Sequence, residues 1–158
     1  MATADGDGWA ACACGSRHWG RYGAAGLLLV CSEGSVLLQL RAGWTHEGGS
    51  WGLLGGARDS HEDAVAAALR EAHEEAAVDP AAVDVIRTIT GVDHGTWAYT
   101  YVLARARTTL RARPMTPESD EVCWVPVARV PRLPLHPAFA AAWPLLTPRI
   151  EEALLRAS

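Results

Sequence analysis

The sequence has no excess of positive charge and no long apolar run. Among its 158 residues, 14 Lys and Arg face 18 Asp and Glu, which gives a formal net charge of −4. This balance offers no basic surface for a nucleic-acid backbone, so an anionic partner would need local arginines or a bridging cation. No apolar run approaches the roughly 20 residues of a membrane span, and the N-terminus shows no secretory signal pattern. We therefore expect a cytoplasmic protein that binds neither nucleic acid nor membrane.

Cysteine is scarce, with only Cys12, Cys14, Cys31 and Cys123 in the chain. Without a secretory signal, a reducing compartment favours free thiols over disulfides. Cys12, Cys14 and Cys31 could bind zinc together with His18, but one residue between the first two cysteines is shorter than the usual knuckle spacing. We expect unligated thiols and leave the zinc site open as the alternative.

The chain also lacks internal repeats, low-complexity tracts and an obvious linker. Its length and its 49% hydrophobic content suit one domain with a sizeable core. We therefore predict a single domain over residues 1–158, in which residues 1–20 form a loosely ordered N-terminal extension.

Short apolar or alternating segments predict strands at residues 24–30, 35–42, 83–92, 96–106 and 120–127. The first two are separated by a short turn and are expected to form a hairpin. A central helix is predicted over residues 60–77 with Ser60 as its N-cap, followed near the C-terminus by one or two helices broken near Pro144 and Pro148. Strands on both sides of a central helix predict an α/β fold, with a mixed sheet flanked by helices on both faces.

The central helix carries an unusual cluster of acids, Glu71, Glu74 and Glu75. Spacings of three and four residues place their Cβ atoms about 5–6 Å apart, so ionised pairs repel by about 3 kcal/mol at an effective dielectric near 20. A divalent cation would convert this repulsion into coordination, and carboxylate oxygens suit Mg²⁺ or Mn²⁺. The alternative is an ordinary solvated acidic face.

The spacing of the whole segment decides between these readings. Gly56 is followed by five residues, Glu62, seven residues and then the run Arg70-Glu71-Ala72-His73-Glu74-Glu75-Ala76-Ala77-Val78. This pattern covers 23 residues and resembles the Nudix box. It departs from the box at Ala77, where glycine is usual, at Leu54, where many members have proline, and at Ala72, which is smaller than the usual aliphatic residue.

The resemblance implies a Nudix-type α/β/α sandwich that uses Mg²⁺ or Mn²⁺ to hydrolyse nucleoside diphosphates linked to another moiety. By position in the box, Glu74 and Glu75 would be metal ligands, Glu71 a ligand or general base, and Arg70 a partner that orients a glutamate. The Gly55 carbonyl would face the metal.

Other candidates lie outside the helix. A later loop would supply a further acid, and we assign Glu121 to the metal and Glu118 to the substrate side. Arg41 and Arg58 could hold phosphate or be plain surface arginines. Trp97 could stack on a base or belong to the core.

The residues downstream of the box that distinguish the family subgroups acting on ADP-ribose and on dinucleoside polyphosphates are absent. The expected substrate is therefore a small nucleotide, most simply a nucleoside triphosphate or a modified one, cleaved to monophosphate and pyrophosphate by metal-activated water. The alternatives are a nucleotide-sugar or ADP-ribose pyrophosphatase and a catalytically weak nucleotide-binding sensor domain. A homodimer is left open.

Overall fold

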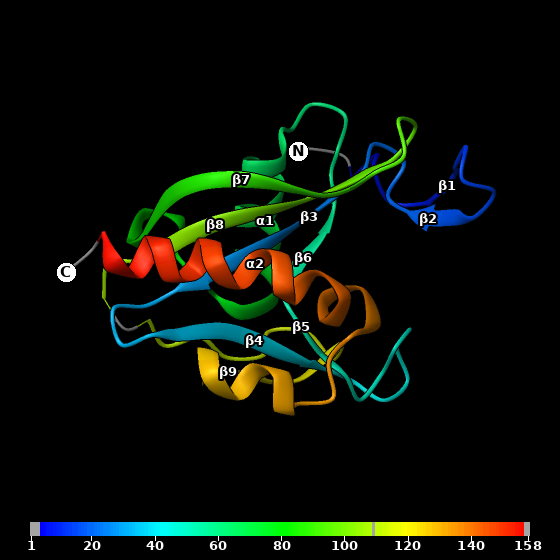
Figure 1. Ribbon diagram of the computed structural model, residues 1–158. Coiled ribbons are helices and arrows are strands. Elements are labelled where there is room, and N and C mark those ends of the chain that lie inside the picture. Colours follow the sequence, from blue (N-terminus) through cyan, green and yellow to red (C-terminus); the bar gives the residue numbers. More distant parts are fainter. Residues whose placement is uncertain (1–3, 109, 157–158) are drawn as a thin grey trace.

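The computed structural model describes residues 4–108 and 110–156. Its centre is a seven-stranded mixed sheet (Figure 1). The strands of this sheet are β3 (Ala24–Val30), β4 (Ser35–Arg41), β5 (Trp51–Gly52), β6 (Leu54–Ala57), β7 (Val83–Asp93), β8 (Ala98–Ala106) and β9 (Ser119–Pro126). The helices are α1 (Ala64–Ala76) and α2 (Pro137–Leu155), with short 3-10 turns at η1 (Pro80–Ala82) and η2 (Val127–Arg132). Within the described residues, neither α-helix combines the length and apolar character that a bilayer span requires.

The order of strands in the sheet is β5-β4-β3-β8-β7, with β6 also paired to β3 and β9 to β4. The central pair β3–β8 is parallel, whereas the other pairs in this sheet are antiparallel. The expected hairpin forms its turn, but β3 and β4 pair only at Val30 and Val36. Beyond that point each strand takes other partners, so the two halves of the hairpin diverge.

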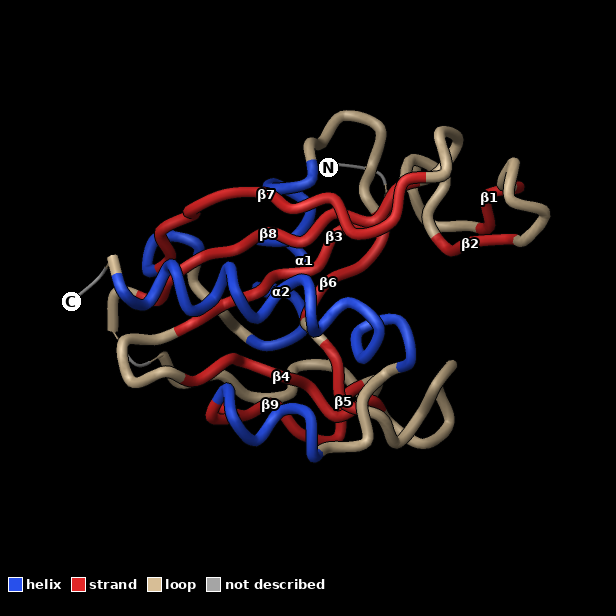
Figure 2. The backbone as a smooth tube through the Cα atoms, viewed as in Figure 1, coloured by secondary structure: helices blue, strands red, loops and turns tan. Residues whose placement is uncertain are grey.

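Two helices cover opposite faces of the sheet (Figure 2). Alternation along β3 explains this arrangement, because successive side chains of a strand point to opposite faces. Leu28 and Val30 pack in a core with α2, while Leu27 and Leu29 pack in a second core with α1. The predicted α/β/α sandwich is confirmed in these layers.

Helix α1 begins later than predicted. Its N-cap is Asp63, whose carboxylate accepts a hydrogen bond from the N–H of Ala66 at 2.8 Å. Ser60, the expected cap, is instead held by Asp5, which accepts from its N–H and its hydroxyl. The sequence prediction failed here because a residue far along the chain competes for the serine.

Helix α1 ends at Ala77, which has a left-handed conformation with φ 57° and ψ 31°. The N–H of Ala77 donates to the His73 carbonyl at 3.0 Å, and the N–H of Val78 donates to the Ala72 carbonyl at 3.3 Å. The first of these bonds is the 5→1 bond of an αL helix end, a left-handed geometry that glycine ordinarily adopts. An alanine therefore occupies the left-handed position at which the sequence pattern leads one to expect glycine.

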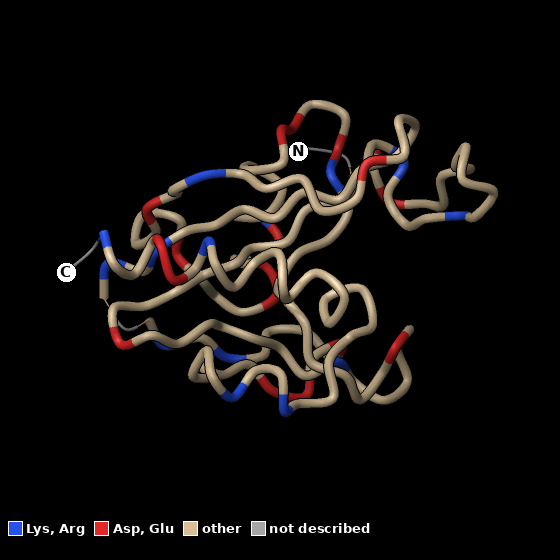
Figure 3. Tube along the Cα trace, in the orientation of Figure 1, with Lys and Arg blue, Asp and Glu red and all other residues tan. Residues whose placement is uncertain are grey.

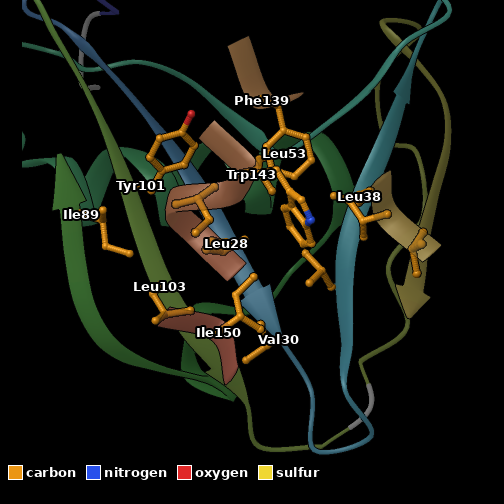
Figure 4. Close-up of a cluster of buried hydrophobic side chains, with 14 of the residues drawn as sticks. Leu28, Val30, Leu38, Leu53, Ile89, Tyr101, Leu103, Phe139, Trp143 and Ile150 are labelled. Carbon is orange, nitrogen blue, oxygen red and sulfur yellow. The ribbon is translucent and has the colours of Figure 1, made fainter. Parts of the chain in front are cut away.

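Helix α2 is continuous, so the predicted break near Pro144 and Pro148 is wrong. Both prolines lie on its exposed side. The opposite side carries a buried stripe of Phe139, Trp143, Leu146, Ile150 and Ala153. Figure 4 shows side chains of this stripe inserted between those of β3 and β4. Burial of each large side chain stabilises the fold by about 1.5–3 kcal/mol. Together these contributions offset the cost of about 3 kcal/mol for each interior proline.

The N-terminal extension contains a separate two-stranded hairpin, β1 (Trp9–Ala11) and β2 (Arg17–Trp19). Figure 1 shows this hairpin beside the ends of β7 and β8, away from α2. A loosely ordered extension was expected over residues 1–20, but residues 4–20 include this hairpin, which hydrogen bonds join to the β7–β8 loop, and residues 1–3 lie outside the described part of the chain.

Candidate active site

The acids of α1 face a cavity of about 540 Å³ whose walls come from several distant parts of the chain. Helix α1 contributes Arg70, Glu71, Glu74 and Glu75, and β6 contributes Gly55, Gly56 and Ala57. Strand β4 contributes Gln39 and Arg41, and the loop before β9 contributes Thr116 and Glu118. The N-terminal segment contributes Ala4, Asp7 and Trp19, and the loop before α1 contributes Asp59. In Figure 3, acidic and basic positions are interspersed over the trace, so the concentration of acids in this one cavity is a local feature.

Two glycines of β6 allow close packing, Gly56 against α1 and Gly55 against β3. A Cβ at Gly56 would lie 2.8 Å from Glu71 Cδ, so any side chain there would displace this carboxylate. A Cβ at Gly55 would collide with the Ala25 carbonyl of the paired strand β3. The N–H of Gly55 in turn donates to Glu75 Oε1 at 3.2 Å, which ties the helix to the strand.

Glu75 is the most buried acid of the cluster, with only 9% of its surface exposed. Burial, followed by the nearby Glu71 carboxylate, raises the pKa of Glu75 to about 9. Burial also raises the pKa of Glu71, although Arg70 opposes the shift. Near neutral pH the two carboxyl groups therefore retain a proton between them, and a divalent cation would provide the same compensation of charge. The all-oxygen donor set suits a hard cation such as Mg²⁺ or Mn²⁺.

Arg70 organises the acids through a fork of hydrogen bonds. Its Nε and Nη2 lie 2.8 and 2.9 Å from the two carboxylate oxygens of Glu62. Its Nη1 lies 3.0 Å from Glu71 Oε1 and 3.5 Å from Glu74 Oε2, and its Nη2 also donates to the Ala57 carbonyl at 3.1 Å. The arginine thus connects β6, the following loop and α1, and its hydrogen bonds to Glu62 lower the pKa of that carboxyl group.

The other predicted site residues divide into two groups. Arg41 and Glu118 line the cavity, and Arg41 Nε donates to the His46 carbonyl at 2.9 Å. Glu121, Arg58 and Trp97 are not among the lining residues.

The three residues outside the cavity wall have other surroundings. Glu121 is exposed on β9, where it pairs with Leu40. Arg58 follows β6, and its buried Nε has no hydrogen-bond partner among the described residues. The Trp97 indole N–H donates to the Trp19 carbonyl at 3.3 Å, which places it at the N-terminal hairpin.

Sequence reasoning missed several residues of the cavity. Gln39 is buried in β4, where its amide donates to the Leu53 carbonyl at 2.9 Å and accepts from the Ser119 hydroxyl at 2.6 Å. A single polar residue inside an apolar strand was a signal that could have identified it. Trp19 and Thr116 reach the cavity only through the tertiary fold, so no local pattern indicated them.

The family model for the NUDIX domain matches residues 20–146. The chain belongs to the NUDIX family. A Mycobacterium tuberculosis protein named as candidate 8-oxo-dGTP diphosphatase 3 is 49% identical over 148 residues, which cover 88% of this chain and 68% of that protein. A nucleoside triphosphate pyrophosphatase/Nudix hydrolase fusion protein from Bifidobacterium longum is 41% identical over 155 residues, covering 93% of this chain and 32% of that protein.

A solved structure confirms the Nudix fold. The crystal structure of a Nudix hydrolase from M. smegmatis, RenU, matches with a TM-score of 0.86 and 45% identity, covering 93% of this chain and 96% of that one. This protein is accordingly a Nudix hydrolase. Its Leu54, at the position where many members carry proline, is 1% exposed and pairs with Leu27 in the sheet, so strand pairing and burial hold the segment that proline would restrain.

Proposed function

We propose that this Nudix hydrolase cleaves a nucleoside triphosphate to monophosphate and pyrophosphate with the help of Mg²⁺ or Mn²⁺, and that an oxidised purine nucleotide such as 8-oxo-dGTP is its first candidate substrate. The observation that carries the proposal is the convergence of Glu71, Glu74 and Glu75 on one cavity with the β6 backbone. The substrate class is supported by the name of the M. tuberculosis relative.

Glu71, Glu74 and Glu75, with the Gly55 carbonyl, would hold the metal. When bound, such a cation neutralises phosphoryl oxygens and lowers the pKa of water. The raised pKa values of Glu71 and Glu75 fit this role, because they show that burial leaves these two carboxyl groups short of positive charge.

The chain's own residues then divide the remaining work. A Glu71 carboxylate oxygen accepts a proton from the attacking water, and Arg70 fixes the orientation of that carboxylate through its bond to Oε1. Arg41 reaches the same cavity and offers a cation to a phosphate. Among the described residues, no cysteine or serine lines the cavity, and the buried Thr116 hydroxyl has no hydrogen-bond partner that would activate it, so the simplest reaction is direct attack of water on phosphorus.

A panel of nucleotides with added Mg²⁺ tests the proposal. We expect release of pyrophosphate from a triphosphate, with 8-oxo-dGTP turned over faster than dGTP, and ¹⁸O from labelled water in a phosphoryl product. Glu74→Gln and Glu75→Gln should reduce turnover by more than the about 10–100-fold that loss of a partner behind a metal ligand costs. Glu151→Gln, at an exposed position on α2, is the matched control and should retain activity.

Two results would redirect the assignment. Faster hydrolysis of ADP-ribose or a nucleotide sugar than of every triphosphate would reject the substrate class but not the metal-dependent reaction. Tight nucleotide binding without turnover of any member of the panel would instead identify a sensor domain.

A further inference from the structure

A second cluster of metal-ligating side chains lies outside the cavity, where the N-terminal hairpin meets the β7–β8 loop. Cys12, Cys14, His18 and His94 each offer one ligand atom, and these four atoms all lie within 4.8 Å of one another. Cys12 Sγ is 3.2 Å from His94 Nδ1, and Cys14 Sγ is 3.2 Å from His18 Nε2. Two thiols and two imidazoles in such a group form a donor set typical of zinc.

The distances suit a tetrahedral ion. Zinc bound at about 2.3 Å to sulfur and about 2.0–2.1 Å to nitrogen places its ligand atoms about 3.3–3.8 Å from one another. The four ligand atoms of the protein, which all lie within 4.8 Å of one another, would reach this arrangement with only small side-chain movements. We propose that Cys12, Cys14, His18 and His94 bind one structural Zn²⁺ that fastens the N-terminal hairpin to the β7–β8 loop.

The fold explains why the sequence pattern was ambiguous. Cys12 and Cys14 occupy the tight turn between β1 and β2, which closes through a bond from the Cys12 N–H to the Ser16 carbonyl at 3.1 Å. Cys31, the fourth candidate from sequence, is 2% exposed at the end of β3 and does not belong to the group. His94 takes that place from a loop 94 − 18 = 76 residues beyond His18, a separation at which no local spacing rule applies.

Neighbouring groups hold two of the ligands, Cys12 and His18, in place. The Cys14 N–H and the Thr96 hydroxyl donate to Cys12 Sγ at 3.4 and 3.5 Å. Thr96 also accepts from the Ala13 N–H at 2.9 Å, which joins the turn directly to the loop. The His18 ring stacks on Trp97, with centroids 4.3 Å apart and an interplanar angle of 18°. Partners of this kind orient metal ligands and are usual around zinc sites.

Apart from its contacts to Thr96 and Trp97, the hairpin is small and its large side chains are exposed. Each of its strands has three residues, and its two large aromatic side chains, Trp9 and Trp19, are 53% and 47% exposed. A two-stranded hairpin of this size is marginal in water, and a metal is one of the usual staples for so small a unit. Four protein ligands fill a tetrahedral zinc, which leaves no open position for catalysis.

The zinc site would also affect the cavity described above, because Trp19 lies next to His18 in β2 and lines that cavity. Fastening the hairpin fixes this part of the wall. The inference does not depend on the proposed substrate, since it concerns different residues and a different metal.

Metal analysis of the full chain, purified under reducing conditions, tests the site directly. We expect one zinc per chain, and X-ray absorption of the wild-type protein should report two sulfur and two nitrogen ligands. Replacing zinc with Co²⁺ should give thiolate-to-cobalt charge-transfer bands and the visible bands of a tetrahedral ion. These wild-type measurements need no variant to fold.

Variants then assign the ligands. Cys14→Ser and His94→Ala should weaken zinc binding by more than the about 10–100-fold caused by losing a partner behind a ligand. Cys123→Ser and His46→Ala, at exposed positions elsewhere, should keep the metal, and Glu74→Gln should keep it too because that residue belongs to the other site. Reduced wild-type protein that binds neither zinc nor cobalt, an oxygen-only ligand shell, or a Cys12–Cys14 disulfide in the native protein would overturn the proposal.

Discussion

Arg70 shows how much the geometry of one side chain adds to its charge. We expect Arg70→Lys to lower kcat by about 10–100-fold with little change in KM, because lysine keeps a positive charge but cannot form the fork to Glu62 while also holding Glu71. Steady-state kinetics with Mg²⁺ measures both constants. Arg107→Lys is the matched control, since Arg107 makes a similar contact to Asp84 at an exposed position away from the cavity. Equal losses in both variants would show that Arg70 acts only on general stability.

Glu75 should make the stability of the protein depend on pH when divalent cations are omitted. Its folded-state pKa of about 9 lies above the ordinary value of 4.5, so the folded state binds the proton more tightly than the unfolded state does. The resulting stabilisation is fully present below pH 4.5 and is lost as pH rises toward about 9. We therefore expect the part of the Tm that depends on Glu75 to fall across this range, Glu75→Gln to reduce the slope, and added Mg²⁺ to oppose the loss. An unchanged slope in the glutamine variant, measured by thermal unfolding, would contradict the assignment.

At the scale of elements, the end of α1 carries a conformational cost that glycine would remove. Ala77 has φ 57°, where a Cβ is unfavourable, so Ala77→Gly should raise the free energy of unfolding by up to about 1 kcal/mol. Ala141→Gly provides the contrast, because Ala141 is exposed in the interior of the right-handed helix α2. This change should lower the free energy of unfolding by about 1 kcal/mol. Urea unfolding measures both. If both substitutions destabilise the protein, the left-handed conformation of Ala77 carries no cost that glycine relieves.

The elements also show which signals the sequence carries. Strands with apolar or alternating runs, such as β3 and β8, were predicted nearly to the residue because their pattern is local. The start of α1 and the continuity of α2 were mispredicted for one shared reason. Ser60 is diverted by Asp5, and Pro148 is tolerated because the other side of its helix is buried, and both effects depend on residues distant in sequence.

The same distinction applies to the two candidate metal sites. Glu71, Glu74 and Glu75 lie within little more than one turn of one helix, so spacing alone indicated their cooperation. In contrast, the cavity takes Trp19 and Gln39 from two separate strands. The cysteine and histidine group likewise takes His94 from a loop far along the chain. Their convergence is produced by the fold, and no periodicity in the sequence records it.

At the scale of the whole molecule, the parallel pair β3–β8 sets the order in which the protein can assemble. Its register joins Ala24 to Tyr99, so the pairing closes a loop of 99 − 24 = 75 residues, at an entropic cost of about 4 kcal/mol by the logarithmic rule. Helix α1 and β6 lie inside that loop, whereas the wall of the acidic cavity also takes residues from before it, such as Trp19, and from after it, such as Glu118. A nascent chain can pair β3 with β6 and pack α1 against both before β8 emerges, whereas the parallel β3–β8 pairing comes later and is slow compared with helix formation. During synthesis, the acidic helix therefore meets β3 and β6 first, and the part of its packing surface that β8 supplies is added only when the second half of the protein has been made.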